Sequence, residues 1–419
     1  MTAAAATAAR VTATAATAAL VACSGSGGAS PRPGGNPGSG TSDATACPAT
    51  PGVSARTLSL GLLYSATGSA AAAFSPYRAG VDARLGVANA AGGINGRTVT
   101  YAWVDDRSET GPNLAGAHQL IDGDRALAVL EESTAASGSA AYLHSIGAPV
   151  LGTPYDIVWT QDSNMFSYST YFSAGAAVST IGDYATRRGG TRAVVISSGH
   201  SGASRIADDK LAASLTAGKV RVVGRLDPSA RVNIATLGAA VKRLRADVLT
   251  GAGAPATFLR VAAAATAKGA RLKAVIAPYG YDENVPAIYG KTLPTLAVYL
   301  TYLPFELNRP AHQRFRAAMA VYSPQTPADS AVALDGWINA DMVLRGLSAA
   351  GRCPTRAGYI AALRGVRGYN AGGLLAQPVD FQADFGRMNT CYVFARIAPS
   401  RNRWTVDQPV PLCGRRLDD

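Results

Sequence analysis

The sequence lacks the patterns that mark several classes of protein. Its four histidines are dispersed and no C-x-x-C or H-x-x-x-H spacing occurs, so we expect neither a metal site nor a cofactor. No run of five or more like charges occurs although the net charge is +12, which argues against nucleic-acid binding. The apolar stretch from Val11 to Val21 is too short to span a bilayer. It is therefore not expected to be a transmembrane helix.

The N-terminal residues instead resemble a bacterial export signal. Arg10 supplies positive charge before the apolar stretch, and Leu20-Val21-Ala22-Cys23 resembles a lipobox. We expect residues 1–22 to be a lipoprotein signal peptide and Cys23 to be lipidated, which would anchor the mature chain to the outer face of the cytoplasmic membrane. Residues 23–55, rich in Ser, Gly, Pro and Ala, are expected to form a flexible linker. An ordinary export signal without lipid is the alternative.

Four cysteines remain when Cys23 is set aside, and in an exported protein an even number predicts two disulfides. The sequence alone allows three connectivities for these four residues. We favour Cys353 with Cys391, which would join a late helix to a late strand. The second bond would then join Cys47 to Cys413, the start of the folded body to its tail.

Composition and periodicity predict an α/β fold. Hydrophobic residues make up 48% of the chain and charged residues 16%, enough for a buried core. From Arg56 onward, continuously apolar runs alternate with helical patterns, as strands buried on both faces of a parallel sheet require. The first series has strands at 57–63, 97–104 and 126–130, with helices at 76–91, 112–122 and 135–145.

A second series with the same rhythm begins at Arg192, which predicts a second lobe similar to the first. Its strands are expected at 193–197, 219–224, 247–250 and 273–277. A further strand at 294–300 precedes helices near 311–322 and 328–350, and the segments 379–381 and 391–397 are expected to form a terminal β-ribbon.

Several short segments resemble the type I periplasmic substrate-binding proteins of ABC importers, specifically the group that binds branched-chain amino acids and amides. The segment Asn89-Ala90-Ala91-Gly92-Gly93-Ile94-Asn95-Gly96-Arg97 is similar to that family's helix-to-strand turn, and Val104-Asp105-Asp106 to the strand end after it. Ser65-Ala66-Thr67-Gly68 and Ile146-Gly147-Ala148-Pro149-Val150 are similar to two further family segments. The resemblance extends over about residues 56 to 410.

This resemblance implies two doubly wound parallel-sheet lobes that are joined by three hinge crossovers and close around a ligand. Residues 56–168 plus 296–370 would form the first lobe, and residues 169–295 plus 371–419 the second. The implied function is that of an extracytoplasmic lipoprotein, not an enzyme. It would bind an amino acid, an amide or a similar small polar solute and deliver it to an ABC permease. We expect a monomer.

The resemblance also implies ligand contacts in the first lobe. Ser133 and Thr134 lie where the family holds a ligand carboxylate, although both would also suit helix capping. The preceding acids, Glu131 and Glu132, depart from the family pattern. In the segment Gly152-Thr153-Pro154-Tyr155-Asp156, the phenol of Tyr155 and the carboxylate of Asp156 would favour a cationic or amide-bearing ligand if they do not simply face solvent.

Further ligand contacts are expected in loops that follow the later strands. His200 and Ser201 lie where relatives have a Tyr-Gly pair, and a surface loop without ligand contact is the alternative. Tyr279, Tyr281 and Tyr302 come after two strands and are expected to shield a ligand or stack on a cation, with ordinary packing as the alternative.

Two other functions compete with transport. The loop Gly199-His200-Ser201-Gly202-Ala203 differs by one residue from the G-x-S-x-G nucleophile elbow of serine hydrolases. A hydrolase needs a downstream histidine, and His312 lies between Arg309 and Arg314 on a helix that looks solvated. A ligand sensor that signals to a membrane partner without transport is the other alternative. Gly251-Ala252-Gly253-Ala254-Pro255-Ala256 resembles a dinucleotide loop, but no acidic residue follows at the required distance, so a simple turn is preferred.

Overall fold

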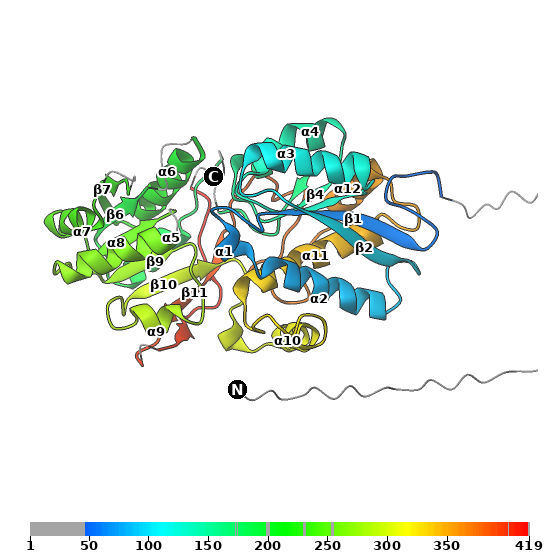
Figure 1. The fold of residues 1–419 in the computed structure, drawn as a ribbon. Coiled ribbons are helices and arrows are strands. Elements are labelled where there is room, and N and C mark those ends of the chain that lie inside the picture. The colour runs from blue at the N-terminus through cyan, green and yellow to red at the C-terminus, as the bar shows by residue number, and fades with distance from the viewer. Residues whose placement is uncertain are drawn as a thin grey trace, which may run out of the picture. The chain divides into compact units, whose positions relative to one another are not determined.

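A computed structural model of the protein contains two β-sheets, each with helices packed on it (Figure 1). It describes residues 47–171, 173, 175–197, 202–228, 232–252, 255–400 and 402–417. Cys23, the expected signal peptide, His200 and Ser201 lie outside the described residues. The helices within those ranges do not combine the length and the apolar character that a membrane span requires.

The first sheet is parallel throughout, with the strand order β2-β1-β3-β4-β5. Its core strands are almost continuously buried, as predicted from their apolar runs. The strands are β1 (Thr57–Tyr64), β2 (Thr98–Asp105), β3 (Val129–Glu132), β4 (Val150–Gly152) and β5 (Met165–Phe166). We call this sheet with its helices the first lobe.

The helices of the first lobe come from two separate stretches of the chain. Helices α10 and α11, late in the sequence, pack on the early helix α2 (Figure 1). Close approach explains two glycines: a Cβ on Gly80 would lie 1.7 Å from the Ala333 carbonyl oxygen, and one on Gly336 would lie 2.1 Å from that of Tyr77. The bounds are α1 (Ala71–Phe74), α2 (Tyr77–Ala90), α3 (Thr110–His118), η1 (Gln119–Gly123), η2 (Ala136–Gly138), α4 (Ala140–Ser145), η3 (Ile157–Thr160), α10 (Pro310–Tyr322), α11 (Ala331–Ala349) and α12 (Arg356–Arg364).

The second sheet has the order β12-β11-β10-β9-β8-β6-β7, with β13 paired to β11. Strands β6 to β10 are parallel, and β11 runs antiparallel to β10, β12 and β13. The elements of this second lobe are α5 (Thr180–Arg187), β6 (Arg192–Ile196), α6 (Gly202–Ala217), β7 (Arg221–Leu226), α7 (Ile234–Arg243), β8 (Val248–Gly251), α8 (Pro255–Ala267), β9 (Ala274–Ala277), α9 (Val285–Tyr289), β10 (Leu296–Leu300), η4 (Phe305–Leu307), β11 (Cys391–Ile397), β12 (Trp404–Val406) and β13 (Leu412–Cys413).

The two-sheet α/β architecture confirms the predicted fold class, with two differences in detail. Strand β10 pairs with β9 in the second sheet, so the expected start of the late first-lobe segment at residue 296 is wrong and the chain crosses after Leu300. The terminal ribbon consists of β11 with β12 and β13, whereas Val379 forms only an isolated bridge with Tyr369. Apolar character identifies a buried strand but not the sheet that it joins.

The disulfide pairing that we favoured is wrong. Cys47 is bonded to Cys353, and Cys391 to Cys413. Cys391 and Cys413 lie directly opposite each other in the β11/β13 pair. At the other bond, the guanidinium of Arg97 donates to the Arg352 carbonyl oxygen at 2.5 Å and to the Cys47 sulfur at 3.2 Å, which fixes the two segments side by side. Each disulfide therefore joins parts of one lobe, whereas the favoured pairing required both bonds to cross between lobes.

Candidate functional site

The carboxyl ends of the first-sheet strands bring several acids together, as a parallel sheet does with the residues that come after its strands. Asp106, after β2, is fully buried and accepts hydrogen bonds from Ser65 Oγ at 2.7 Å, Asn113 Nδ2 at 3.0 Å and Ser133 Oγ. Asn113 Nδ2 also donates to Glu131 Oε1 at 2.9 Å. These contacts form a buried polar network beneath the strand ends.

The two residues expected to hold a ligand carboxylate differ in their placement. The hydroxyl of Ser133 donates to Asp106 and accepts from the Ala135 backbone N–H at 2.8 Å, so its donor is used within the protein. Thr134 is exposed. An anion at Ser133 would lie next to the carboxylate of Asp106, which would repel it.

Next to this network lies a second group, which we call the acid–tyrosine cluster. The phenol of Tyr155 donates to Glu132 Oε1 at 2.8 Å, and the phenol of Tyr168 donates to Asp335 Oδ1. Asn339, one turn after Asp335 on α11, donates to Tyr77 Oη at 3.0 Å and to Thr153 Oγ1 at 3.2 Å. The members of the cluster are Tyr77, Glu132, Thr153, Tyr155, Tyr168, Asp335 and Asn339.

The electrostatics of this region favour neutral acids. Burial raises the pKa of Glu131 to about 8 and that of Asp335 to about 7. Burial and then the charge of Asp335 raise the pKa of Glu132, against a smaller opposing effect of the Thr153 and Tyr155 hydroxyls. None of the salt bridges formed among the described residues includes Glu131, Glu132 or Asp335. The cluster therefore holds buried acids that have no cationic partner among the described residues.

The second lobe contributes aromatic rings to the same region. Tyr279, after β9, contacts Tyr155 of the first lobe with 6.4 Å between ring centroids. Tyr171 lies 6.1 Å from Tyr279 by the same measure, and its phenol and the Thr301 hydroxyl are 3.2 Å apart. Burial and the charge of Asp335 raise the pKa of Tyr302, which places this fully enclosed residue near the cluster. Of the predicted tyrosines, Tyr279 thus contacts Tyr155, whereas the ring of Tyr302 contacts that of Tyr281.

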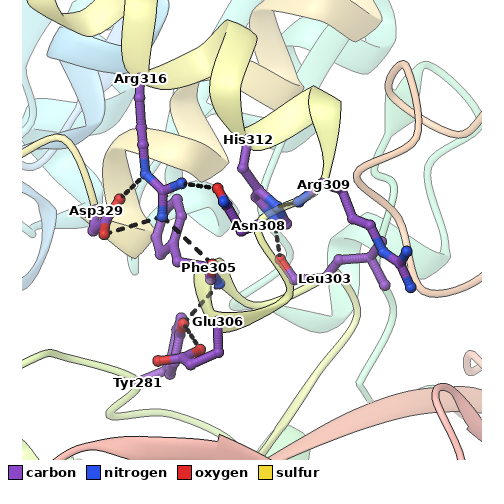
Figure 2. A network of polar contacts seen from close by, with 9 residues as sticks. All are labelled: Tyr281, Leu303, Phe305, Glu306, Asn308, Arg309, His312, Arg316 and Asp329. Carbon is purple, nitrogen blue, oxygen red and sulfur yellow. Dashed lines mark hydrogen bonds and ion pairs between the residues drawn. The ribbon is translucent and has the colours of Figure 1, made fainter.

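Tyr281 lies in a different network, drawn in Figure 2. Its phenol donates to Glu306 Oε2 at 2.5 Å and accepts from the Phe305 backbone N–H at 2.9 Å. Its ring contacts Tyr302, Phe305 and Trp404. These contacts fix the turn η4, which leads from β10 to α10, and they use both the donor and the acceptor of the phenol.

His312 lies in the same network and is not solvated, contrary to our expectation. It is fully buried; its Nδ1 accepts from the Arg309 backbone N–H at 3.0 Å and its Nε2 donates to the Leu303 carbonyl oxygen at 2.9 Å (Figure 2). Burial lowers its pKa, so the ring is neutral with both nitrogens bonded to backbone. This arrangement leaves no ring nitrogen free to activate a serine. Ser201, the other half of the hydrolase hypothesis, lies outside the described residues.

A small cavity near Tyr168 does not compete as a solute site. Its volume is about 30 Å³, room for one or two water molecules only. Arg364 on its wall lies 4.2 Å from the ring centroids of Phe166 and Phe385 and donates to three backbone carbonyl oxygens. In the described ranges, no three His, Cys, Asp or Glu side chains are grouped so that they could hold a metal ion.

Sequence reasoning missed several members of the cluster. Glu132 was noticed only as a departure from the family pattern, and Asp335 and Asn339 were not identified. A signal existed for these two, since they are polar residues four positions apart on α11, a helix that is otherwise mostly buried and apolar. Asp156, which we did predict, is half-buried, and its charge raises the pKa of Glu131.

Comparison with known proteins gives one family and a consistent fold. A family model described as periplasmic binding protein matches residues 57–402, and no curated protein matches the chain. A branched-chain amino acid ABC transporter structure from Thermus thermophilus with bound valine superposes with a TM-score of 0.72 at 14% identity, covering 85% of this chain and 97% of that one. The structure of an R. palustris solute binding protein in complex with benzoate superposes with a TM-score of 0.67 at 17% identity, covering 86% of this chain and 98% of that one. A fatty acid ABC transporter substrate-binding protein from Thermomonospora curvata superposes with a TM-score of 0.69 at 16% identity, covering 89% of this chain and 95% of that one. At these identities the structures establish the fold alone.

Proposed function

Because the chain belongs to the periplasmic binding protein family, we propose that it captures a small polar solute outside the cytoplasm and delivers it to the permease of an ABC transporter. The solute is an amino acid, an amide or a similar compound and is released unaltered. The valine and benzoate complexes among the similar structures support a solute of this size.

One observation carries this proposal: side chains from the carboxyl edges of both sheets contact each other at the acid–tyrosine cluster. Tyr155 comes after β4 of the first sheet and Tyr279 after β9 of the second, and their rings are in contact. Ligands of α/β proteins bind beyond the carboxyl ends of parallel strands, and a solute enclosed by two such edges is bound from both sides. Movement of the lobes about their connections would admit and release it.

The proposed contacts come from both lobes. Tyr155 and Asp156 from the first lobe, Tyr279 from the second and Tyr302, which comes after β10, have the placement in the fold that supports this role. Thr134, His200 and Ser201 remain predictions from the family resemblance, whereas the hydroxyls of Ser133 and Tyr281 are already bonded within the protein. No catalytic role is proposed, because the cluster holds hydrogen-bonding and aromatic groups without a nucleophile paired to a base.

The proposed location rests on the N-terminal sequence. We expect cleavage before Cys23 and lipid on its sulfur, with residues 23–55 as the tether to the outer face of the cytoplasmic membrane. Mass spectrometry of the N-terminal peptide from the membrane fraction tests this directly, and an unmodified Cys23 would contradict it.

A thermal-shift screen of the mature chain tests solute binding. Amino acids, amides, ureas and aromatic acids are added singly, and a true solute stabilises the protein by RT ln(1 + [L]/Kd), about 2.7 kcal/mol at a hundredfold excess over Kd. Tyr155→Ala should remove the shift, and Trp103→Ala, at an exposed ring outside the cluster, should keep it. Chemical conversion of the bound compound would contradict the proposal.

A further inference from the structure

Three buried oxygen atoms near the first-sheet edge lack a hydrogen-bond donor. Glu131, Glu132 and Asn339 are fully buried, and no described residue donates to Glu131 Oε2, Glu132 Oε2 or Asn339 Oδ1. Buried acceptors in native proteins are almost always paired, because an unpaired one loses its hydration without replacement. These three oxygens are open to donors that a bound molecule supplies.

Two of these oxygens belong to side chains with a common neighbour. That neighbour is Thr153, whose hydroxyl oxygen accepts a hydrogen bond from Asn339 Nδ2 at 3.2 Å. The same hydroxyl lowers the pKa of Glu132, but Glu132 Oε2 receives no hydrogen bond from it. The phenol of Tyr155 donates to the other carboxylate oxygen, Glu132 Oε1, at 2.8 Å. The open acceptors therefore lie within one small region of the acid–tyrosine cluster.

The acids in this region favour a ligand whose head group is positively charged. Asp335 is close enough to Glu132 for their charges to repel, and neither acid has a basic partner among the described residues. A carboxylate ligand would add a further negative charge, and the hydroxyl of Ser133 that would otherwise receive it is bonded to Asp106. A positively charged donor would relieve the repulsion and pair the open oxygens together.

The aromatic residues fit the same partner. Tyr77, Tyr155, Tyr168 and Tyr302 all lie near Glu132 or Asp335. The phenols of Tyr155 and Tyr168 donate to the two acids. Their ring faces remain electron-rich surfaces that attract a cation. Two buried acids, each bonded to a phenol, are chemically suited to an organic ammonium or guanidinium group.

Resting on the proposed function, we propose that the solute carries a positively charged nitrogen, as an amine, guanidine or quaternary ammonium group does, and that Glu132 and Asp335 bind it. Glu132 makes the direct contact, and Asp335 adds charge from α11. The first lobe is thus the cation-binding side of the site. It does not bind a carboxylate through Ser133 and Thr134.

Isothermal titration of the mature chain with matched probes tests this. Isoamylamine, isovaleramide and isovalerate share one carbon skeleton, as do benzylamine, benzamide and benzoate, so that each set keeps the skeleton and varies the head group and its charge. Agmatine, putrescine, choline, valine and leucine extend the series. We expect at least one cationic probe to bind, and its uncharged or anionic counterpart to bind at least tenfold more weakly.

Variants separate charge recognition from folding. Glu132→Gln keeps the acceptor for Tyr155 and should weaken the cation's Kd at least tenfold, while Glu283→Gln, the same change at an exposed loop residue, should leave Kd within twofold. Asp335→Asn provides a second test if Glu132→Gln does not give folded protein by circular dichroism.

The outcomes distinguish the two proposals. If isovalerate or benzoate binds while every probe with a positively charged nitrogen fails, or if Glu132→Gln and Asp335→Asn leave the cation's Kd unchanged, the cation inference is overturned and solute capture stands. If no compound in the series or in the broader thermal-shift screen binds, both proposals are contradicted. Tight cation binding that depends on Glu132 supports both.

Discussion

The two sheets share one construction and differ in the residues at the carboxyl ends of their strands. Both are parallel in their central strands and almost fully buried. The first sheet ends in acids, Asp106, Glu131 and Glu132, whereas the second ends in tyrosines, Tyr279 and Tyr302. The difference shows that the fold fixes where side chains meet and the strand-end residues fix what they recognise. In the proposed site the first edge supplies the acids and part of the ring surface, and the second edge adds further rings.

The disulfides give the largest expected contrast between the lobes. In the chain-entropy account, a bond that closes a longer loop restricts the unfolded chain more. The Cys47–Cys353 bond of the first lobe spans 306 residues and the Cys391–Cys413 bond of the second spans 22. Replacing both cysteines by serine should cost about 5 kcal/mol in the first lobe and about 3 kcal/mol in the second, measured by urea unfolding. Equal losses, or a larger loss for the short loop, would contradict the entropic reasoning.

Loss of a hydrogen bond should destabilise the protein more at the carboxyl edge of the first sheet than beside the second sheet. Asp106→Ala removes the acceptor for Ser65, Asn113 and Ser133 at a fully buried position, and we expect a loss of about 3 to 4 kcal/mol. Tyr171→Phe removes only the contact with the Thr301 hydroxyl and should cost about 1 kcal/mol or less. Urea unfolding of both variants measures the difference. A loss for Tyr171→Phe as large as that for Asp106→Ala would show that the second edge also depends on its polar contacts.

The stability of the ligand-free protein should depend on pH because the buried acids near the carboxyl edge of the first sheet titrate. Because the pKa values of Glu131 and Asp335 are raised to about 8 and about 7 in the folded state, the folded chain binds more protons than the unfolded one between about pH 4.5 and pH 8. Stability therefore falls as pH rises through that window. His312, whose pKa is lowered, acts in the opposite direction below about pH 6.5.

Unfolding at pH 6.5 and pH 8 isolates the acids. We expect a decrease of about 1 to 2 kcal/mol across this interval, and a smaller decrease in Glu131→Gln and Glu132→Gln. A cationic solute should show the reverse trend and bind more tightly as these acids ionise. Stability that rises over the same interval, or an unchanged slope in both variants, would contradict the assigned directions of the pKa shifts.

The smallest expected difference is between Tyr281 and Tyr155, which have the same side chain but should affect solute affinity differently. Tyr281→Phe loses the contacts to Glu306 and Phe305 and should cost about 1 kcal/mol of stability while leaving solute affinity within twofold. Tyr155→Phe leaves Glu132 Oε1 without its donor and should change solute affinity severalfold. Titration of both variants with the same solute measures this. If Tyr281→Phe has the larger effect on affinity, the site has been placed on the wrong tyrosines.

The fold could be predicted in most of its elements because strand burial leaves a direct trace in the sequence. The predicted strand at 57–63 corresponds to β1 and that at 273–277 to β9, since short, continuous apolar runs in an α/β chain are typical of strands buried on both faces. The sheet to which β10 belongs and the partners of the cysteines could not be predicted in this way. Both depend on which segments meet after folding, and apolar runs and residue counts do not encode that.

The site could be predicted less well because residues of the same type, at similar positions after a strand, form hydrogen bonds to different groups in the folded protein. Tyr155 and Tyr281 both come after a strand, but Glu306 lies 25 positions after Tyr281 and bonds its phenol. Ser133 has the residue type that suits an anion, yet Asp106, reached from another strand, uses its hydroxyl. The sequence places Tyr155 and Tyr279 after strands whose ends meet in the fold, but which of their atoms are free is set by contacts across the fold.

A crystal structure of the mature chain with the solute that stabilises it most would test the central claim directly. We predict that the solute lies between Tyr155 and Tyr279, with a nitrogen within hydrogen-bonding distance of Glu132. A solute bound elsewhere, or bound there with a carboxylate facing Ser133 and Thr134, would contradict the account.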